Sequence, residues 1–175
     1  AGTLAYLRAN LCRDGPEMMR RDAYDAWEGL SPTSPFRTAM LFTEGLSDVL
    51  DGNQDRADAV FAHTYDLATG FGALPMIALV LAERFLIAAE REDWPTADAL
   101  LERAVEILEP GRLDGYWTSA LVFAAAARAA AHRGHMHAAR GYVKRAARLR
   151  PLMTYALPVV SVQALLELAR AYLAV

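Results

Sequence analysis

Apolar positions along the chain recur mostly at intervals of three and four residues, the spacing of one face of an α-helix. Glycine, proline and short polar stretches interrupt this pattern and divide the chain into nine predicted helices. The first two predicted helices cover residues 3–12 and 16–29, the third ends at 51, and the fourth runs from its N-cap at 53 to 69. The fifth ends at 91, and the sixth runs from 95 to before 110. The seventh covers 114–133, the eighth ends at 150, and the ninth runs from 155 to the end. No run of alternating, β-branched residues predicts a strand.

Particular residues set the breaks between these helices. The clearest break covers residues 31–35, and Pro151 predicts another. Glycine adopts the left-handed backbone conformation that ends many helices, so Gly52 and Gly134 are predicted to close the third and seventh helices. Asn53 is the predicted N-cap of the fourth helix, because its side chain can accept a backbone hydrogen bond.

The helices pair up, and a couple of residues repeats on the second helix of each pair. A small residue precedes a bulky one by four positions, so that both share a helix face. The couples are Ala23 with Trp27, Ala57 with Phe61, Ala97 with Leu101, and Ala138 with Tyr142, and their alanines follow one another at intervals of 34, 40 and 41 residues. Gly45, twelve residues before Ala57, lies where such repeats use a small residue on the first helix. We expect the bulky members to form the core between helices.

Intervals of this length are typical of stacked helix-turn-helix repeats. The sequence therefore predicts an all-α fold, a right-handed α-solenoid of tetratricopeptide-like (TPR-like) repeats, forming a single domain over residues 1–175. An alanine-rich helical bundle could produce one such couple by chance, but four at near-regular intervals favour the repeat. The chain begins on a helical pattern and ends without a stop signal, so we expect it to be a piece of a longer protein.

Composition limits the function classes. The formal net charge of −3 gives no general electrostatic case for binding nucleic acid or an anionic membrane. The longest apolar run, residues 74–82, is far shorter than the roughly 20 residues that span a bilayer, so no membrane association is expected. Cys12 is the only cysteine and no secretory signal is visible, which fits a cytoplasmic protein.

Motifs of catalysis and cofactor binding are missing from the sequence. It contains no G-x-x-x-x-G-K-[ST], H-E-x-x-H, G-x-S-x-G or C-x-x-C pattern. His132, His135 and His137 cluster around the predicted break at Gly134, but they have no neighbouring Cys or carboxylate, and we interpret them as a polar turn rather than a metal site. We therefore expect neither a cofactor nor an enzymatic activity in this segment.

Two charged rows occupy matching helices. Arg140, Lys144 and Arg148 form a basic row on the eighth predicted helix, and Asp98, Glu102 and Glu106 form an acidic row on the sixth. The basic row would suit phosphate groups, but helices six and eight would be neighbours in a stacked solenoid. We favour mutual charge complementarity and predict no direct DNA contact by this segment.

The fifth and seventh predicted helices are apolar on nearly all faces, over residues 74–89 and 116–131. Such a helix is either buried centrally or faces a ligand or partner, and burial is the simpler interpretation. The functional alternative is an inner groove whose aromatic and charged groups bind a ligand or partner. The candidate residues for that site are Arg84, Tyr116, Trp117 and Arg128. An arginine in apolar surroundings needs a partner, which for Arg128 could be Glu83, Glu90 or a backbone carbonyl.

Several sequence runs resemble the TPR-like region of LuxR-type, MalT-like transcriptional regulators. These runs are TSALVFAAAAR (118–128), HRG (132–134), RLRPLMTYALP (148–158) and LELARAYL (166–173), with CRDGP (12–16) and SPFR (34–37) nearer the start. In that family this region lies between an ATPase module and a C-terminal DNA-binding helix-turn-helix, binds an inducer or partner protein, and helps set the oligomeric state. The resemblance implies a sensing and interaction segment, with ATP and DNA binding in other domains.

Two functions remain open on the sequence. In the first, a small-molecule effector or protein partner binds one curvature of the solenoid and shifts the full-length regulator between resting and DNA-binding forms. In the second, the chain is a protein–protein interaction scaffold without a small-molecule ligand. A deep pocket under Trp117 would favour sensing, whereas an open apolar face matched across a two-fold axis would favour self-association.

Overall fold

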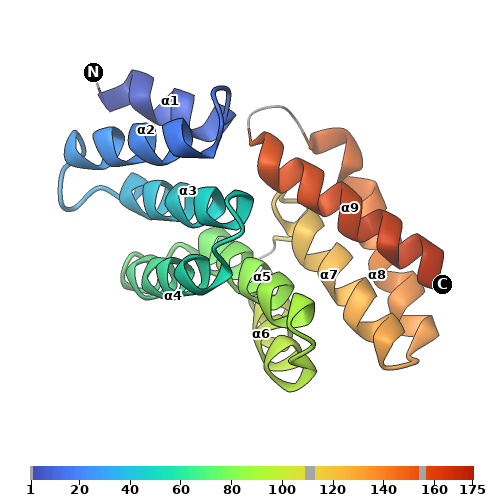
Figure 1. The fold of residues 1–175 in the computed structure, drawn as a ribbon. Coiled ribbons are helices and arrows are strands. Elements are labelled where there is room, and N and C mark those ends of the chain that lie inside the picture. Colours follow the sequence, from blue (N-terminus) through green and yellow to red (C-terminus); the bar gives the residue numbers. More distant parts are fainter. Residues whose placement is uncertain (1, 109–112, 154–156) are drawn as a thin grey trace.

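The protein folds into α-helices joined by short turns, as shown by a computed structural model that describes residues 2–108, 113–153 and 157–175 (Figure 1). The helices are α1 (Gly2–Leu11), α2 (Pro16–Glu28), α3 (Phe36–Leu50), α4 (Gln54–Gly70), α5 (Leu74–Glu90), α6 (Trp94–Leu108), α7 (Ser119–His132), α8 (Met136–Leu149) and α9 (Pro158–Ala174). A short 3₁₀ turn, η1 (Arg150–Leu152), follows α8. The described residues thus contain the nine predicted helices and no strand.

Most predicted helix ends agree with the structure to within a few residues. Asn53 caps α4, with its Oδ1 accepting a hydrogen bond from the Arg56 backbone N–H at 3.3 Å. Gly52 and Gly134 both have a φ of 76°, the left-handed conformation expected where α3 and α7 end. The predicted break at Pro110 and the predicted start of the ninth helix at Tyr155 lie outside the described residues.

The start of the seventh helix was predicted wrongly. The apolar pattern placed it at Asp114, but α7 begins at Ser119. Residues 113–118 form turns instead, in which the Tyr116 N–H donates to the Leu113 carbonyl at 2.9 Å. The Ser119 hydroxyl also donates to the Leu113 carbonyl at 2.9 Å, which stabilises this turn against extension of the helix. Tyr116 and Trp117 therefore precede α7 and do not lie on it.

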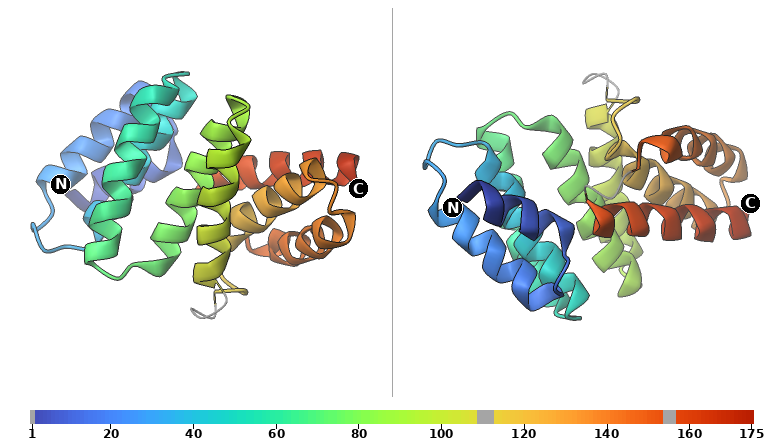
Figure 2. Two further views of the ribbon diagram at one scale, coloured as in Figure 1. Left: turned by 90° about the horizontal axis from the view of Figure 1, so that it is seen from below. Right: turned by 90° about the horizontal axis from the view of Figure 1, so that it is seen from above.

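Consecutive helices from α1 to α8 pack against each other in order along the chain. In Figure 1, α1 to α4 lie on one side of the molecule and α7 to α9 on the other, with α5 and α6 between them. Helix α7 contacts α8, α9 and α5, so α9 returns to the face of α7 (Figure 2). The two helices that are apolar all round, α5 and α7, are the most buried ones, as the simpler interpretation predicted. No helix in the described ranges is both long and apolar enough to cross a membrane.

The prediction that the bulky members of the couples are buried is confirmed at two of the four sites. Ala57 with Phe61 and Ala97 with Leu101 are buried, while Ala23 is buried beside a half-buried Trp27. The fourth couple is wrong by one residue. Ala138 is exposed and Tyr142 is half-buried, and the buried pair at the same spacing is Ala139 with Val143.

Gly45 and Phe61 show how closely α3 and α4 approach each other. A Cβ atom at Gly45 would lie 2.5 Å from Phe61 Cε1, nearer than side-chain atoms normally come. The Phe61 ring is fully buried and packs against Phe42 with ring centroids 5.6 Å apart. The small residue predicted on the first helix of this pair therefore makes room for the bulky residue on the second.

The expected pairing of the two charged rows is also wrong. Among the described residues, the acidic row is paired with Arg133, which lies 3.6 Å from Asp98 and 3.3 Å from Glu102. No ion pair joins that row to Arg140, Lys144 or Arg148 within the described ranges, because α8 packs on α7 rather than on α6.

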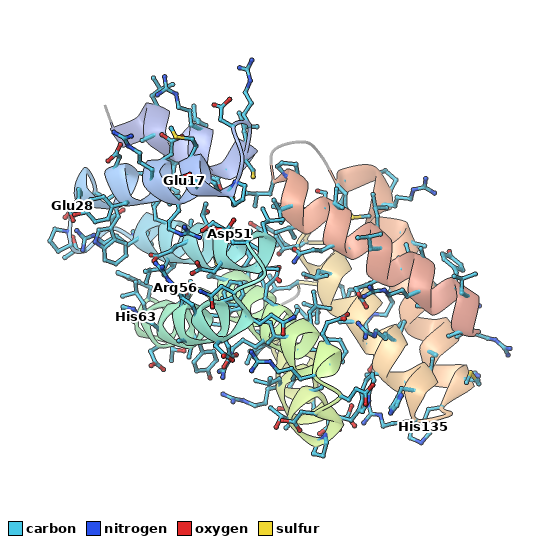
Figure 3. The ribbon with its side chains drawn as sticks, in the orientation of Figure 1. Glu17, Glu28, Asp51, Arg56, His63 and His135 are labelled. Carbon is cyan, nitrogen blue, oxygen red and sulfur yellow. The ribbon has the colours of Figure 1, made fainter. Side chains whose placement is uncertain are left out.

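Elsewhere, ion pairs connect neighbouring helices. Asp48 of α3 is almost fully buried and forms two ion pairs. Its Oδ1 lies 2.9 Å from Arg20 Nη2 of α2, and its Oδ2 lies 3.2 Å from Arg56 Nε of α4. Figure 3 shows Arg56 on α4 near the α3 side, with Asp51 at the end of α3. These contacts tie three consecutive helices together through one carboxylate.

Candidate functional site

The four predicted site residues lie in three separate places. Arg84 projects from α5 to α4, where its Nε lies 2.7 Å from Asp58 Oδ1 and its Nη2 lies 3.3 Å from Asp58 Oδ2. This two-point contact engages both oxygens of the carboxylate and joins two consecutive helices. The structure thus gives Arg84 a position between helices and does not bring it to the other candidates.

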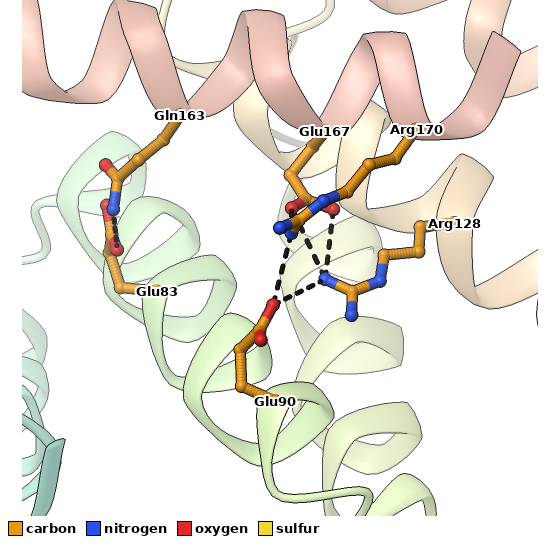
Figure 4. A network of polar contacts seen from close by, with 6 residues as sticks. All are labelled: Glu83, Glu90, Arg128, Gln163, Glu167 and Arg170. Atoms are coloured by element: carbon orange, nitrogen blue, oxygen red, sulfur yellow. Dashed lines mark hydrogen bonds and ion pairs between the residues drawn. The ribbon is translucent and has the colours of Figure 1, made fainter. Parts of the chain in front are cut away.

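Arg128 of α7 belongs to a polar network with side chains from α5 and α9 (Figure 4). Its Nη1 lies 3.3 Å from Glu167 Oε2 and 3.4 Å from Glu90 Oε1. Arg170 of α9 reaches the same two carboxylates, at 2.6 Å from Glu167 and 3.1 Å from Glu90. Of the partners expected for Arg128, Glu90 is confirmed, Glu83 is not a direct partner, and Glu167 was not anticipated.

Glu83 lies in the same region, buried between α5 and α9. Its side chain is 1% exposed, and its Oε2 accepts a hydrogen bond from Gln163 Nε2 at 2.9 Å. Burial raises the pKa of Glu83 from its ordinary value of 4.5 to about 8, with a smaller opposing effect from Gln163 and a reinforcing one from the negative charge of Glu167. At neutral pH this carboxyl is therefore mostly protonated.

The loss of Arg128 tests whether it is structural. Arg128→Met is expected to lower the free energy of unfolding by about 1–3 kcal/mol, because the buried Glu167 would lose one of the two charged partners that it has among the described residues and keep Arg170. Urea denaturation monitored by circular dichroism gives this quantity. The control is Arg91→Met, whose partner Asp55 is almost fully exposed, so its loss should stay below about 1 kcal/mol. Equal losses in the two variants would show that the network contributes no more than a surface ion pair.

Tyr116 and Trp117 line a pocket at the other end of α5. Its volume is about 330 Å³, and its aromatic wall consists of Tyr6, Phe36, Phe42, Tyr116 and Trp117. These residues come from α1, α3 and the turn before α7, and Leu157 at the start of α9 completes the lining. We call it the aromatic pocket.

The rings in the aromatic pocket contact one another at its rim. Tyr6 packs edge-on against Phe36 with ring centroids 5.8 Å apart. Burial raises the pKa of Tyr6, Asn10 partly opposes this rise, and the nearby Tyr116 adds to it. The rim thus combines large apolar surfaces with two phenol groups and an amide, the mixture typical of small-molecule sites.

Metal binding has no support in the described residues, where no three His, Cys, Asp or Glu side chains gather closely enough to hold an ion. His132 instead stacks on Trp94, with ring centroids 3.5 Å apart and an interplanar angle of 10°. Figure 3 places His135 at the turn between α7 and α8, away from the helix interfaces. His132 at the end of α7 thus contacts α6, whereas His135 lies at the turn that follows α7.

The sequence reasoning missed Gln163, Glu167 and Arg170 of α9, and it named Glu83 only as a partner for Arg128. The available signal was the presence of charged residues in apolar helices, since a buried charge requires a partner. Glu167 is 2% exposed and lies in such a helix. Comparison of the chain with protein-family models, with curated proteins and with solved structures gives no significant match in any of the three.

Proposed function

We propose that this chain is the sensing and interaction segment of a cytoplasmic transcription regulator of the LuxR type, built as a right-handed solenoid of TPR-like repeats. The aromatic pocket is the site of its small-molecule effector. One observation carries this proposal: elements far apart in the chain, from α1 to the start of α9, all contribute to the wall of a single aromatic-lined pocket. The sequence resemblance supplies the type of regulator.

This construction suits a sensor because a ligand there contacts several elements at once. Tyr6 and Phe36 come from the first helices, and Tyr116, Trp117 and Leu157 come from segments that precede α7 and α9. A ligand that contacts the residues from the first helices as well as those that precede α7 and α9 stabilises the arrangement in which these segments lie close together. Binding then shifts the population of the full-length regulator, provided that its affinity differs between the two arrangements.

The ligand class follows from the lining. A volume of about 330 Å³ is at the lower end of the range for ligand pockets. Aromatic walls favour a flat apolar molecule, and the hydroxyl groups of Tyr6 and Tyr116 favour one polar substituent. We therefore propose a planar aromatic effector with a hydroxyl or ring N–H group.

DNA contact belongs to another part of the proposed regulator. The chain carries a net charge of −3, and many of its arginines form ion pairs within the fold, among them Arg20, Arg56, Arg84, Arg128 and Arg133. An anion-binding surface needs basic groups directed outward on one face. This supports the view that the segment senses and does not read DNA.

Titration with flat aromatic probes tests the aromatic pocket. Indole, p-cresol and 2-naphthol are titrated into the ¹⁵N-labelled chain, and at least one is expected to bind saturably, with amide shift changes at α1, at the start of α3 and around Trp117. Trp117→Ala should weaken that binding at least ten-fold, because it removes the largest ring of the wall. The control is Tyr172→Ala, which removes an exposed ring of α9 and should leave the affinity unchanged.

The proposal fails if none of the three probes binds saturably, or if Trp117→Ala binds as tightly as the unaltered chain. Shift changes that map to another part of the chain would move the site elsewhere. The melting temperature of each variant is measured alongside, so that unfolding is not mistaken for lost binding.

A protein-interaction scaffold is the second candidate, and a feature of α9 favours it. Large apolar side chains that share one face of this helix are exposed and form a stripe along it. The stripe consists of Val162, Leu165, Leu166, Tyr172 and Leu173. Exposed apolar stripes of this kind mark protein-binding surfaces. Sedimentation velocity over a concentration series distinguishes the candidates, since self-association through α9 would raise the mass with concentration.

A further inference from the structure

Helix α9 is apolar on all its faces, but the fold buries only one of them. Its 17 residues include two charged side chains, Glu167 and Arg170. Helix α5 has the same length and a similar apolar character, and eleven of its residues are buried, against six in α9. A helix that is apolar all round is normally covered on all sides. The second face of α9 therefore has the character of a contact surface.

The uncovered face of α9 has the spacing of a helix–helix contact. In both views of Figure 2, α9 lies along one edge of the fold, with α7 and α8 on one side of it. Exposed apolar residues recur on the other side at intervals of four, three and four residues: Val162, Leu166, Ala169 and Leu173. We call this set the α9 seam. Such intervals keep side chains on one line of a helix and are those of a coiled-coil seam.

The order of large and small residues makes the α9 seam complementary to itself. Across a two-fold axis, each contact occurs twice with the two copies exchanged. An antiparallel pair with its axis midway between Leu166 and Ala169 places the large residue of each copy opposite the small residue of the other. The same axis places Val162 opposite Leu173. A parallel pair would instead place Ala169 opposite Ala169 and leave a gap at that level.

The exposed area is sufficient for a pair of copies. Leu165 and Tyr172, which flank the α9 seam, are 41% and 56% exposed, and Leu173 is 90% exposed. The large apolar side chains of this face together expose on the order of 500 Å² on each copy, so that a pair buries about 1,000 Å², the lower bound for a specific interface. Burial of this face leaves no unpaired charge, because Arg170 already forms ion pairs with Glu90 and Glu167.

We propose that α9 is the dimer interface of this chain, in which the α9 seams of two copies pack antiparallel across a two-fold axis, with Leu166 of each copy against Ala169 of the other. This inference rests on the second candidate function, the interaction scaffold, and names a second copy of the chain as its partner. It does not involve the aromatic pocket, so a monomeric chain that still binds an aromatic probe would refute the dimer alone.

Sedimentation velocity from about 5 to 200 µM tests the dimer on the 175-residue chain. The mass is expected to rise with concentration from 19.1 kDa toward twice that value. Leu166→Arg and Ala169→Glu should each weaken dimerisation at least ten-fold, because each inserts a charge into the α9 seam. The matched control is Leu4→Arg on α1, since Leu4 is 54% exposed and Leu166 is 55% exposed. It should leave the dimerisation constant unchanged.

A mixture of the two seam variants tests the antiparallel register. Equal amounts of Leu166→Arg and Ala169→Glu should dimerise more tightly than either variant alone, because the new arginine of one copy meets the new glutamate of the other. Melting temperatures show whether the variants are folded. If either is unfolded, ¹⁵N amide shifts of the unaltered chain decide instead, and their concentration dependence must map to α9.

A chain that stays monomeric up to about 200 µM overturns the inference and assigns the exposed face of α9 to another protein or segment. A dimer that both seam variants leave intact, or that Leu4→Arg weakens as much as they do, places the interface elsewhere and also overturns it. A mixture that dimerises no better than its components excludes the antiparallel arrangement.

Discussion

Phe61→Ala is expected to lower the free energy of unfolding by about 3–5 kcal/mol. The Phe61 ring is fully buried between α3 and α4, where it contacts Phe42 and fills the space that Gly45 leaves open. Truncation removes the transfer free energy of the ring and leaves a cavity that the flanking helices can only partly fill. Chemical denaturation with a linear extrapolation to water measures the loss.

The control for Phe61→Ala is Tyr24→Ala, because Tyr24 is an aromatic residue on α2 that is 64% exposed. Its substitution should change the free energy of unfolding by less than about 1 kcal/mol. A loss below about 1 kcal/mol for Phe61→Ala as well would show that the small-to-bulky couple does not hold these helices together.

Gly45→Ala tests the same contact, because the sign of its effect on the free energy of unfolding depends on the Phe61 ring. In the interior of a helix, alanine normally stabilises by about 1 kcal/mol relative to glycine. Here the added Cβ would lie 2.5 Å from the Phe61 ring, so the substitution should destabilise the protein. Combining Gly45→Ala with Phe61→Ala should remove this penalty, because the second substitution deletes the ring that the methyl group meets.

Local patterns were sufficient to predict this part of the fold. Gly45 and Phe61 could be singled out because Ala57 and Phe61 share a helix face and helix-turn-helix repeats use a small residue on the first helix, although Phe85 and Ala126 hold that place in the later repeats. The same reasoning failed at α8, where Ala138 and Ala139 are adjacent alanines. Ala139 is buried and Ala138 is exposed in the structure. Because both residues are alanines, the sequence alone does not show which of them faces the neighbouring helix. The contact partner of a helix decides which of its faces is buried, and a local pattern does not contain that partner.

The candidate site shows the same limit. The apolar surroundings of Arg128 correctly indicated that it needs a partner, and Glu90 was among those expected. Glu167 was not predicted as a partner, because the return of α9 to α7 is a property of the whole fold and is not contained in a local pattern. Tyr116 and Trp117 were predicted to lie in the seventh helix. In the structure they lie in the turn before α7, and there they line the aromatic pocket.

Glu83→Gln is expected to make the protein more stable than the unaltered chain at pH 8 and above. The pKa of Glu83 is about 8 in the folded protein, whereas an unfolded chain has the ordinary value of 4.5. Between these two values the folded state holds a proton that the unfolded state has lost, so the stability from this group is complete below pH 4.5 and disappears as pH rises through 8. One pKa unit corresponds to about 1.4 kcal/mol, so the full difference is roughly 5 kcal/mol.

Glutamine does not titrate, and its amide oxygen can accept the hydrogen bond that Gln163 Nε2 donates to Glu83 Oε2. The difference in free energy of unfolding between Glu83→Gln and the unaltered chain should therefore be small near pH 4.5 and grow to roughly 5 kcal/mol above pH 8. Urea denaturation at intervals from pH 4.5 to 9 measures it, and comparison of the two proteins cancels the titration of all other groups. Glu106→Gln should show no such growth, because its carboxyl is exposed. A difference for Glu83→Gln that stays constant across the range would mean that Glu83 is ionised in the folded protein throughout, and a compensating charge would then have to be sought among Arg128 and Arg170.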